Sequence, residues 1–132
     1  MLDYRMIFEH ITFKSELSLK DFMDILCKEI PLFNVKYEYE NETEWYTACD
    51  VDNIEVNISR PYEENTLNEW DNSVPEGYNF GISLINSKRD FVYCELKYNE
   101  NYVLAVLIPK YIKIIQKITN HEAKYHRGNY LR

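Results

Sequence analysis

The sequence predicts an α+β fold, a mainly antiparallel sheet of five to six strands with two helices packed on it. Three observations support this prediction: a capped amphipathic run near residues 19–30, several short runs with a period of two, and a helical stripe after Pro109. The chain has 132 residues, of which 45% are hydrophobic. This length fits one domain and this composition can fill a core, so we expect a single α+β domain over residues 1–132.

The first two elements are a strand and a helix. Residues 4–13 alternate well enough to predict a strand, with Ile7, Ile11 and Phe13 partly off register. Ser18 can cap the following helix, and Asp21 stands where a capping-box acid would reach back to it. Apolar residues then recur at helical spacing, at Leu19, Phe22, Met23, Leu26 and Ile30, and Pro31 ends the run. This pattern predicts an amphipathic helix over about residues 19–30.

Alternation of apolar and polar residues predicts the strands that follow. The runs lie at residues 35–39, 45–49, 54–58, 78–85 and 91–98. The clearest is 54–58, where apolar side chains at every second position indicate a strand with one face in water. Residues 86–90, between the last two runs, are typical of a hairpin loop.

The C-terminal part leaves two alternatives. In the first, residues 103–108 form a last strand and a helix starts at Pro109. In the second, one long helix starts near Asn101 and kinks at Pro109. The strand is favoured because a proline inside a helix costs about 3 kcal/mol. In both cases a helix carries an apolar stripe, made of Tyr111, Ile114, Ile115 and Ile118. Residues 121–132 lack periodicity and are expected to form an extended or partly mobile tail.

Charge is distributed unevenly along the chain. Residues 38–76 hold twelve carboxylates and one cation, Arg60, whereas residues 110–132 hold six cations and one acid. The net charge of −7 argues against nucleic-acid binding, which needs clustered cations. The start of the chain does not resemble a signal peptide, and the longest apolar run, 103–108, is far shorter than the roughly 20 residues that span a bilayer. We therefore expect a cytoplasmic protein without membrane contact.

Cysteine usage and metal-ligand spacing predict no cofactor and no metal site. Three cysteines, Cys27, Cys49 and Cys94, indicate buried free thiols in a reducing compartment, since their number is odd and no CxxC occurs. Residues 50–53 resemble a calcium loop, but Pro61 stands where its twelfth-position glutamate would be. Residues 121–126 resemble HExxH with the second histidine one position too far.

The histidines and cysteines are the candidates for catalysis. His10, His121 and His126, with Lys124 or Arg127 for a phosphate, suit ribonuclease-like acid–base chemistry, but their spacing is unspecific. Cys49 and Cys94 lie within apolar strand runs, where a thiol is normally inert. The sequence therefore predicts a protein that is not an enzyme.

The best candidate for function is an acidic, aromatic contact surface. Residues 60–78 form the longest segment whose apolar residues follow neither the helical period nor the strand period of two. Long loops of this kind are often functional. Tryptophan and tyrosine dominate interface energy, and surrounding carboxylates attract a basic partner. The expected partner-binding residues are Tyr62, Glu63, Glu64, Glu69, Trp70 and Asp71, followed by Glu42, Glu44 and Trp45. The alternative is that Trp70 folds back over the sheet and the acids are only solvated.

Residues 4–84 resemble bacterial immunity proteins of contact-dependent inhibition and related polymorphic toxin systems. The resemblance lies in an N-terminal strand, a capped helix (SLKDFMDILCKEI), acidic aromatic strands (YEYENETEWYTACDVDNIEVNIS) and the segment RPYEENTLNEWDNSVPEGYNFGISL. It implies a cytoplasmic, non-catalytic protein that neutralises a cognate toxin domain, often a nuclease with a cationic cleft. The alternative is a non-catalytic phage or plasmid accessory protein that acts as a homo-oligomer. The sequence leaves the oligomeric state open.

Overall fold

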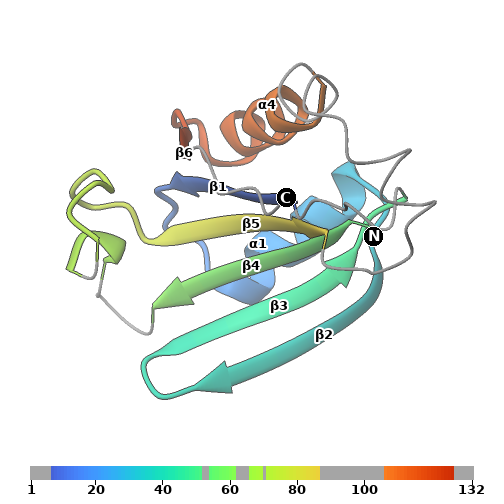
Figure 1. The fold of residues 1–132 in the computed structure, drawn as a ribbon, viewed down its shortest axis with the longest axis horizontal. Helices are drawn as coiled ribbons and strands as arrows, with labels where there is room; N and C mark the ends of the chain where they lie inside the picture. The colour runs from blue at the N-terminus through green and yellow to red at the C-terminus, as the bar shows by residue number, and fades with distance from the viewer. Residues whose placement is uncertain (1–6, 52–53, 62–65, 70, 87–105, 127–132) are drawn as a thin grey trace, which may run out of the picture.

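The predicted α+β class is confirmed by the computed structural model, which describes residues 7–51, 54–61, 66–69, 71–86 and 106–126. In these residues a six-stranded sheet carries two helices (Figure 1). The strands are β1 (Ile7–Phe13), β2 (Phe33–Glu40), β3 (Thr43–Cys49), β4 (Glu55–Pro61), β5 (Phe80–Asn86) and β6 (Lys124–His126). Their spatial order is β2-β3-β4-β5-β1-β6, and every pairing is antiparallel.

The first helix, α1 (Leu19–Glu29), follows the predicted bounds to within one residue. The Ser18 hydroxyl accepts a hydrogen bond from the backbone N–H of Asp21 at 3.1 Å, which satisfies one of the donors left open at a helix start. Ile30 then turns into extended backbone ahead of Pro31. The buried side of the helix consists of Leu19, Phe22, Met23 and Leu26, as the helical spacing predicts.

Substituting Ser18 with alanine is expected to lower the free energy of unfolding by about 1 kcal/mol. The reason is that Asp21 N–H would lose its side-chain acceptor at the start of α1. Urea denaturation followed by circular dichroism measures the change. Ser18→Asp is the matched control, because aspartate also accepts this bond and should keep the wild-type stability. Equal losses in both variants would contradict the capping role.

The second helix, α4 (Ile108–Thr119), shows that the predicted strand at 103–108 is wrong for its last three residues. Val106 and Leu107 form a π-helical turn that leads into α4, and Pro109 lies in the first turn. Proline is tolerated there because its missing N–H would have no partner within the helix. Leu107 and Ile108 are both buried, so core packing favours this start. Residues 103–105, the predicted strand at 91–98 and residues 87–90 of the predicted loop lie outside the described residues.

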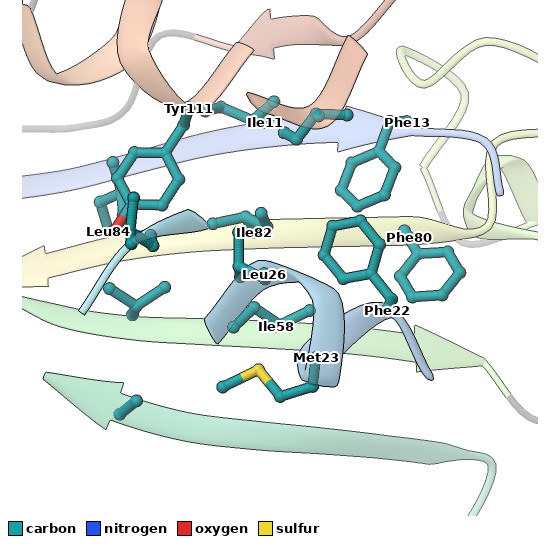
Figure 2. Packing of buried hydrophobic residues seen from close by; sticks show 14 of the residues in the cluster. Ile11, Phe13, Phe22, Met23, Leu26, Ile58, Phe80, Ile82, Leu84 and Tyr111 are labelled. Carbon is teal, nitrogen blue, oxygen red and sulfur yellow. The ribbon is translucent and has the colours of Figure 1, made fainter. Parts of the chain in front are cut away.

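Both helices bury their apolar sides in one cluster on the same face of the sheet. At one end of this core the rings of Phe13, Phe22 and Phe80 pack with centroids 5.0–5.2 Å apart (Figure 2). Tyr111 and Ile115 join it from α4, and Lys117 of α4 pairs with Glu29 of α1 at 2.7 Å. The opposite face of the sheet therefore carries the alternate side chains of each strand.

Two further details differ from, or add to, the sequence prediction. Cys27 is exposed, so the expectation of buried thiols is wrong for this residue, which lies beside the apolar stripe of α1 and outside it. Cys49 is half-buried and free. Within the expected C-terminal tail, residues 124–126 form β6 and pair with residues 10–12 of β1.

Candidate functional site

The β2–β3 hairpin (residues 33–49, here the acidic hairpin) forms one edge of the sheet (Figure 1). All eight residues of β2 are exposed, including Phe33, Val35, Tyr37 and Tyr39. Tyr39 has 70% of its surface exposed and Tyr37 has 47%. Among the described strands β2 pairs with β3 alone, so its outer side presents backbone N–H and C=O groups that none of them pairs. The hairpin therefore offers apolar side chains and an open backbone edge together.

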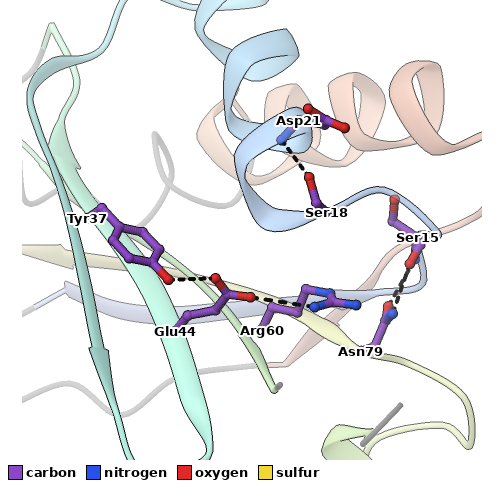
Figure 3. A network of polar contacts seen from close by, with 7 residues as sticks. All are labelled: Ser15, Ser18, Asp21, Tyr37, Glu44, Arg60 and Asn79. Carbon is purple, nitrogen blue, oxygen red and sulfur yellow. Dashed lines mark hydrogen bonds and ion pairs between the residues drawn. The ribbon is translucent and has the colours of Figure 1, made fainter. Parts of the chain in front are cut away.

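On the helix-bearing side of the acidic hairpin, three tyrosines form a cluster, and the carboxylate of Glu44 holds it in place. The ring of Tyr37 lies 6.1 Å from that of Tyr39 and 5.2 Å from that of Tyr46. Glu44 accepts a hydrogen bond from the Tyr37 hydroxyl at 2.9 Å and pairs with Arg60 at 3.5 Å (Figure 3). The Glu44 side chain is only 16% exposed, so it orients the cluster more than it faces solvent.

The other side of the acidic hairpin carries the remaining acids. The indole N–H of Trp45 donates to Glu38 Oε2 at 3.0 Å, which fixes the indole against β2. Near the turn, Glu40, Glu42 and Trp45 line a shallow open hollow. Across residues 33–49 four glutamates, at 38, 40, 42 and 44, face one lysine, Lys36. This side of the hairpin is therefore acidic and aromatic, whereas on the tyrosine side the carboxylate of Glu44 is paired with Arg60.

Residues 66–78 hold the second group of predicted contacts. Glu69 ends a short 3₁₀ helix, η1 (Leu67–Glu69), and Asp71 follows it, both exposed. The segment is tied down by three hydrogen bonds: Leu67 N–H to Tyr78 O at 2.8 Å, Asn68 Nδ2 to Val74 O at 2.7 Å, and Lys124 Nζ to Ser73 O at 3.2 Å.

Five of the nine predicted contact residues can thus be placed. Glu42, Glu44 and Trp45 lie on the acidic hairpin, and Glu69 and Asp71 lie in residues 66–78. The β3–β4 register sets Thr43 opposite Pro61 and the β4–β5 register sets Ser59 opposite Gly81, so the hairpin turn and the end of residues 66–78 lie at the same end of the sheet. Tyr62, Glu63, Glu64 and Trp70 lie outside the described residues.

A second site lies on the face away from the helices. There, a cavity of about 590 Å³ separates the sheet from Leu67 and residues 71–74. We call it the histidine pocket and define it by its main polar side chains, His10, Thr12, Ser59, Asp71, Ser83 and His126. The two histidines are direct neighbours across β1 and β6. Ser83 Oγ lies 2.9 Å from His10 Nδ1, and Thr12 Oγ1 lies 2.8 Å from His126 Nε2, so a hydroxyl holds each imidazole in place.

The environment of the histidine pocket favours uncharged imidazoles. Burial lowers the pKa of His10 below its usual value, and His126 lowers it further, against the opposing effect of Glu9 and Asp71. Burial and then the Lys124 ammonium lower the pKa of His126. Hydrogen bonds from the hydroxyl and the backbone of Ser73 lower the pKa of Asp71. At neutral pH the two imidazoles are therefore neutral and Asp71 is ionised.

The sequence named His10, His126 and Lys124 together only in a catalytic hypothesis of unspecific spacing, and it did not predict that they lie side by side with Thr12, Ser59 and Ser83. His10 and His126 stand at opposite ends of the chain, and only the pairing of β1 with β6 makes them neighbours. The available signal is the alternation of β1, since His10 and Thr12 alternate with the buried Ile11 and Phe13. His121 is exposed and does not line the pocket, and Arg127 lies outside the described residues.

Asp50, which the sequence placed in a possible calcium loop, has a local structural role. It is buried, and its Oδ1 accepts a hydrogen bond from the Ile54 N–H at 2.9 Å in the turn between β3 and β4. Within the described ranges, no three His, Cys, Asp or Glu side chains are grouped so as to hold a metal ion.

The stability of the protein is expected to fall as pH is lowered from 7.5 to 5.5. Since folding lowers the pKa of His10 and His126, the unfolded chain binds more protons in this range. The stabilisation is present above the unfolded pKa of about 6.5 and is lost as pH falls toward the folded values. Urea denaturation at a series of pH values measures the slope.

The matched control is the exposed His121. His10→Asn combined with His126→Asn should flatten the pH dependence, whereas His121→Asn should keep it. A wild-type free energy of unfolding that stays constant from pH 7.5 to 5.5 would contradict the lowered pKa values of His10 and His126.

The described part of the chain contains no helix with the length and hydropathy needed to cross a membrane. In comparisons with known proteins, no family model, no curated protein and no solved structure matches this chain.

Proposed function

We propose that this protein is a cytoplasmic immunity protein, a non-catalytic inhibitor that binds a basic toxin domain through its acidic hairpin. The observation that carries the proposal is the exposed β2 edge, where Tyr37 and Tyr39 project from one face and Glu38 and Glu40 from the other. The resemblance of residues 4–84 to immunity proteins supports the same function.

The aromatic side chains supply the binding energy in this proposal. Tyrosine buries a large area with few torsions to freeze, and it is enriched among residues that dominate interfaces. Tyr37 is already oriented by its bond to Glu44, which Arg60 holds in turn. A cluster ordered before binding loses less entropy when a partner covers it.

The carboxylates select the partner. Four glutamates against one lysine on residues 33–49 create a negative local field, and the whole chain adds a net charge of −7. Such a field accelerates encounter with a basic surface by about 10- to 1,000-fold and rejects acidic ones. A nuclease domain has a cationic cleft for its substrate, so an acidic inhibitor suits this class of toxin.

The proposal is tested with the product of the gene directly upstream. Tagged protein is used to capture that product from a lysate, at low and at moderate salt, and growth of cells that express the toxin domain is measured with and without this chain. We expect a 1:1 complex that survives moderate salt and restored growth. Capture of nothing, together with a defined oligomer of this chain, would replace the proposal with homo-oligomeric assembly between the acidic hairpin and the exposed lysines of α4.

Substituting Glu42 with glutamine should slow association and reduce its dependence on salt, while dissociation stays nearly constant. Glu42 is an exposed acid at the hairpin turn, so it acts at the rim through the long-range field. Stopped-flow or surface-plasmon kinetics at two ionic strengths measures both rates. Glu16→Gln, at an exposed acid outside residues 33–49 and 66–78, is the control and should have a smaller effect. An unchanged association rate in Glu42→Gln would remove this residue from the contact surface.

A further inference from the structure

The floor of the histidine pocket consists of two neighbouring rows of residues across the sheet. One row is His126, His10 and Ser83, and the next is Lys124, Thr12, Gly81 and Ser59. Side chains in these rows point to the face away from the helices, because the residues between them are buried in the core or, for Tyr125 of β6, packed against it. Hydroxyl and imidazole groups from four strands therefore converge on one surface.

Gly81 opens the space between these groups. A Cβ added to it would lie 3.6 Å from Leu67 Cδ1 and 3.6 Å from Ser59 Oγ, which is ordinary contact distance. The missing side chain leaves a gap between Thr12 and Ser59, and the cavity of about 590 Å³ falls within the range of small-ligand sites, roughly 300–1,000 Å³.

The roof of the pocket is held in place by bonds of its own. Asp71 accepts from the backbone and the hydroxyl of Ser73, and Ser73 O accepts from Lys124 on β6. Leu67 and Val74 add apolar surface above the polar floor. A ligand would enter a preformed site with one polar and one apolar side, which lowers the entropic cost of binding.

Charge decides which ligand fits. Among the described residues, Asp71 on the roof and Lys124 on the floor are of opposite charge, Glu9 acts on His10 from the core side of β1, and burial favours the neutral form of both imidazoles. An anion would meet the Asp71 carboxylate and the net charge of −7. A cation would find one carboxylate already engaged by Ser73. Hydroxyls and neutral imidazoles both donate and accept hydrogen bonds, as do the hydroxyl groups of sugars.

We propose that the histidine pocket binds a neutral polyhydroxylated small molecule of the sugar or nucleoside class. Thr12, Ser59 and Ser83 hydrogen-bond its hydroxyl groups, and Leu67 and Val74 contact its C–H surface. None of the described residues that line the pocket belongs to the acidic hairpin, so failure of this proposal would leave the proposed function unaffected, and the reverse also holds.

The test is an NMR titration of the full chain with four probes. Maltose and adenosine are the neutral probes, and glucose 6-phosphate and adenosine monophosphate are their charged counterparts. We expect saturable shifts for at least one neutral probe at the amides of Thr12, Ser59 and Ser83, with weaker binding of its phosphorylated counterpart. No saturable shift with either neutral probe, or tighter binding of the phosphorylated ones, would overturn the proposal.

Two substitutions at one position locate the binding. Gly81→Leu places a large side chain in the gap and should weaken binding by about tenfold or more, because filling the site excludes the ligand. Gly81→Ala is the matched control, since its Cβ meets neighbours at ordinary distances and leaves most of the cavity open. Ser59→Ala, which changes one hydroxyl and no packing volume at Gly81, should also weaken binding. Unchanged affinity in both Gly81→Leu and Ser59→Ala would place the ligand elsewhere and overturn the assignment.

Discussion

Phe22→Ala is expected to lower the free energy of unfolding by about 3–5 kcal/mol. The Phe22 side chain is fully buried, and its ring packs against Phe13 of β1 and Phe80 of β5 at centroid distances of 5.0 and 5.2 Å (Figure 2). Removing the ring takes away buried apolar surface and leaves a cavity between α1 and the sheet. A helix and two strands that hold their positions cannot collapse fully into that space.

Urea denaturation at neutral pH measures this loss, with Cys27→Ala as the control on the same helix. Cys27 is exposed, so its substitution should change the stability by less than about 0.5 kcal/mol. A loss below about 1.5 kcal/mol for Phe22→Ala would mean that the aromatic cluster packs less tightly than the structure shows.

The parts of the fold that local physics determines could be predicted from the sequence. Helix α1 has a capping serine, an apolar face at helical spacing and a terminating proline, and the structure reproduces all three. Strand β4 has strict alternation, and its residues Val56 and Ile58 are buried. Each signal lies within a dozen residues, so it can be recognised without knowing which distant segment packs against it.

Strand β1 contains a buried acidic residue that its sequence pattern does not predict. Glu9 is fully buried on the core side of β1, between the apolar positions, where a charged residue is unexpected. The hydroxyl of Tyr125 in β6 donates to Glu9 Oε1 at 2.9 Å. The structure buries Ile11 and Phe13, the positions expected to be off register, on the same side of β1 as Glu9, so the buried side of this strand differs from the one that the sequence pattern favours.

The two candidate sites also differ in how far the sequence predicts them. The acidic hairpin could be predicted in part, since Glu42, Glu44 and Trp45 belong to one local hairpin whose charge is visible in the sequence. The exposure of β2 could not, because it depends on which strand lies at the edge of the sheet. The histidine pocket depends on the β1–β6 and β1–β5 pairings, which join residues far apart in the chain.

Tyr39→Ala is expected to weaken the complex with the cognate toxin domain by about 2 kcal/mol, which is about thirtyfold in Kd. Tyr39 is the most exposed of the large apolar side chains on β2, with 70% of its surface free, so its removal should leave the folded state nearly as stable as before. A partner that covers the β2 edge would bury this ring and lose that contact area in the variant. Isothermal titration calorimetry with the upstream-encoded toxin domain measures the change.

The matched control for Tyr39 is Val51→Ala, at an exposed apolar residue in the turn that joins β3 to β4. The β2–β3 register sets Tyr39 opposite Glu44 beside the hairpin turn, whereas Val51 follows Cys49 at the other end of β3. Loss of affinity in Tyr39→Ala with unchanged affinity in Val51→Ala would locate the partner at the hairpin end of the edge strand. If a complex forms and neither substitution changes its Kd, the toxin domain binds elsewhere, and the acidic hairpin only steers its approach.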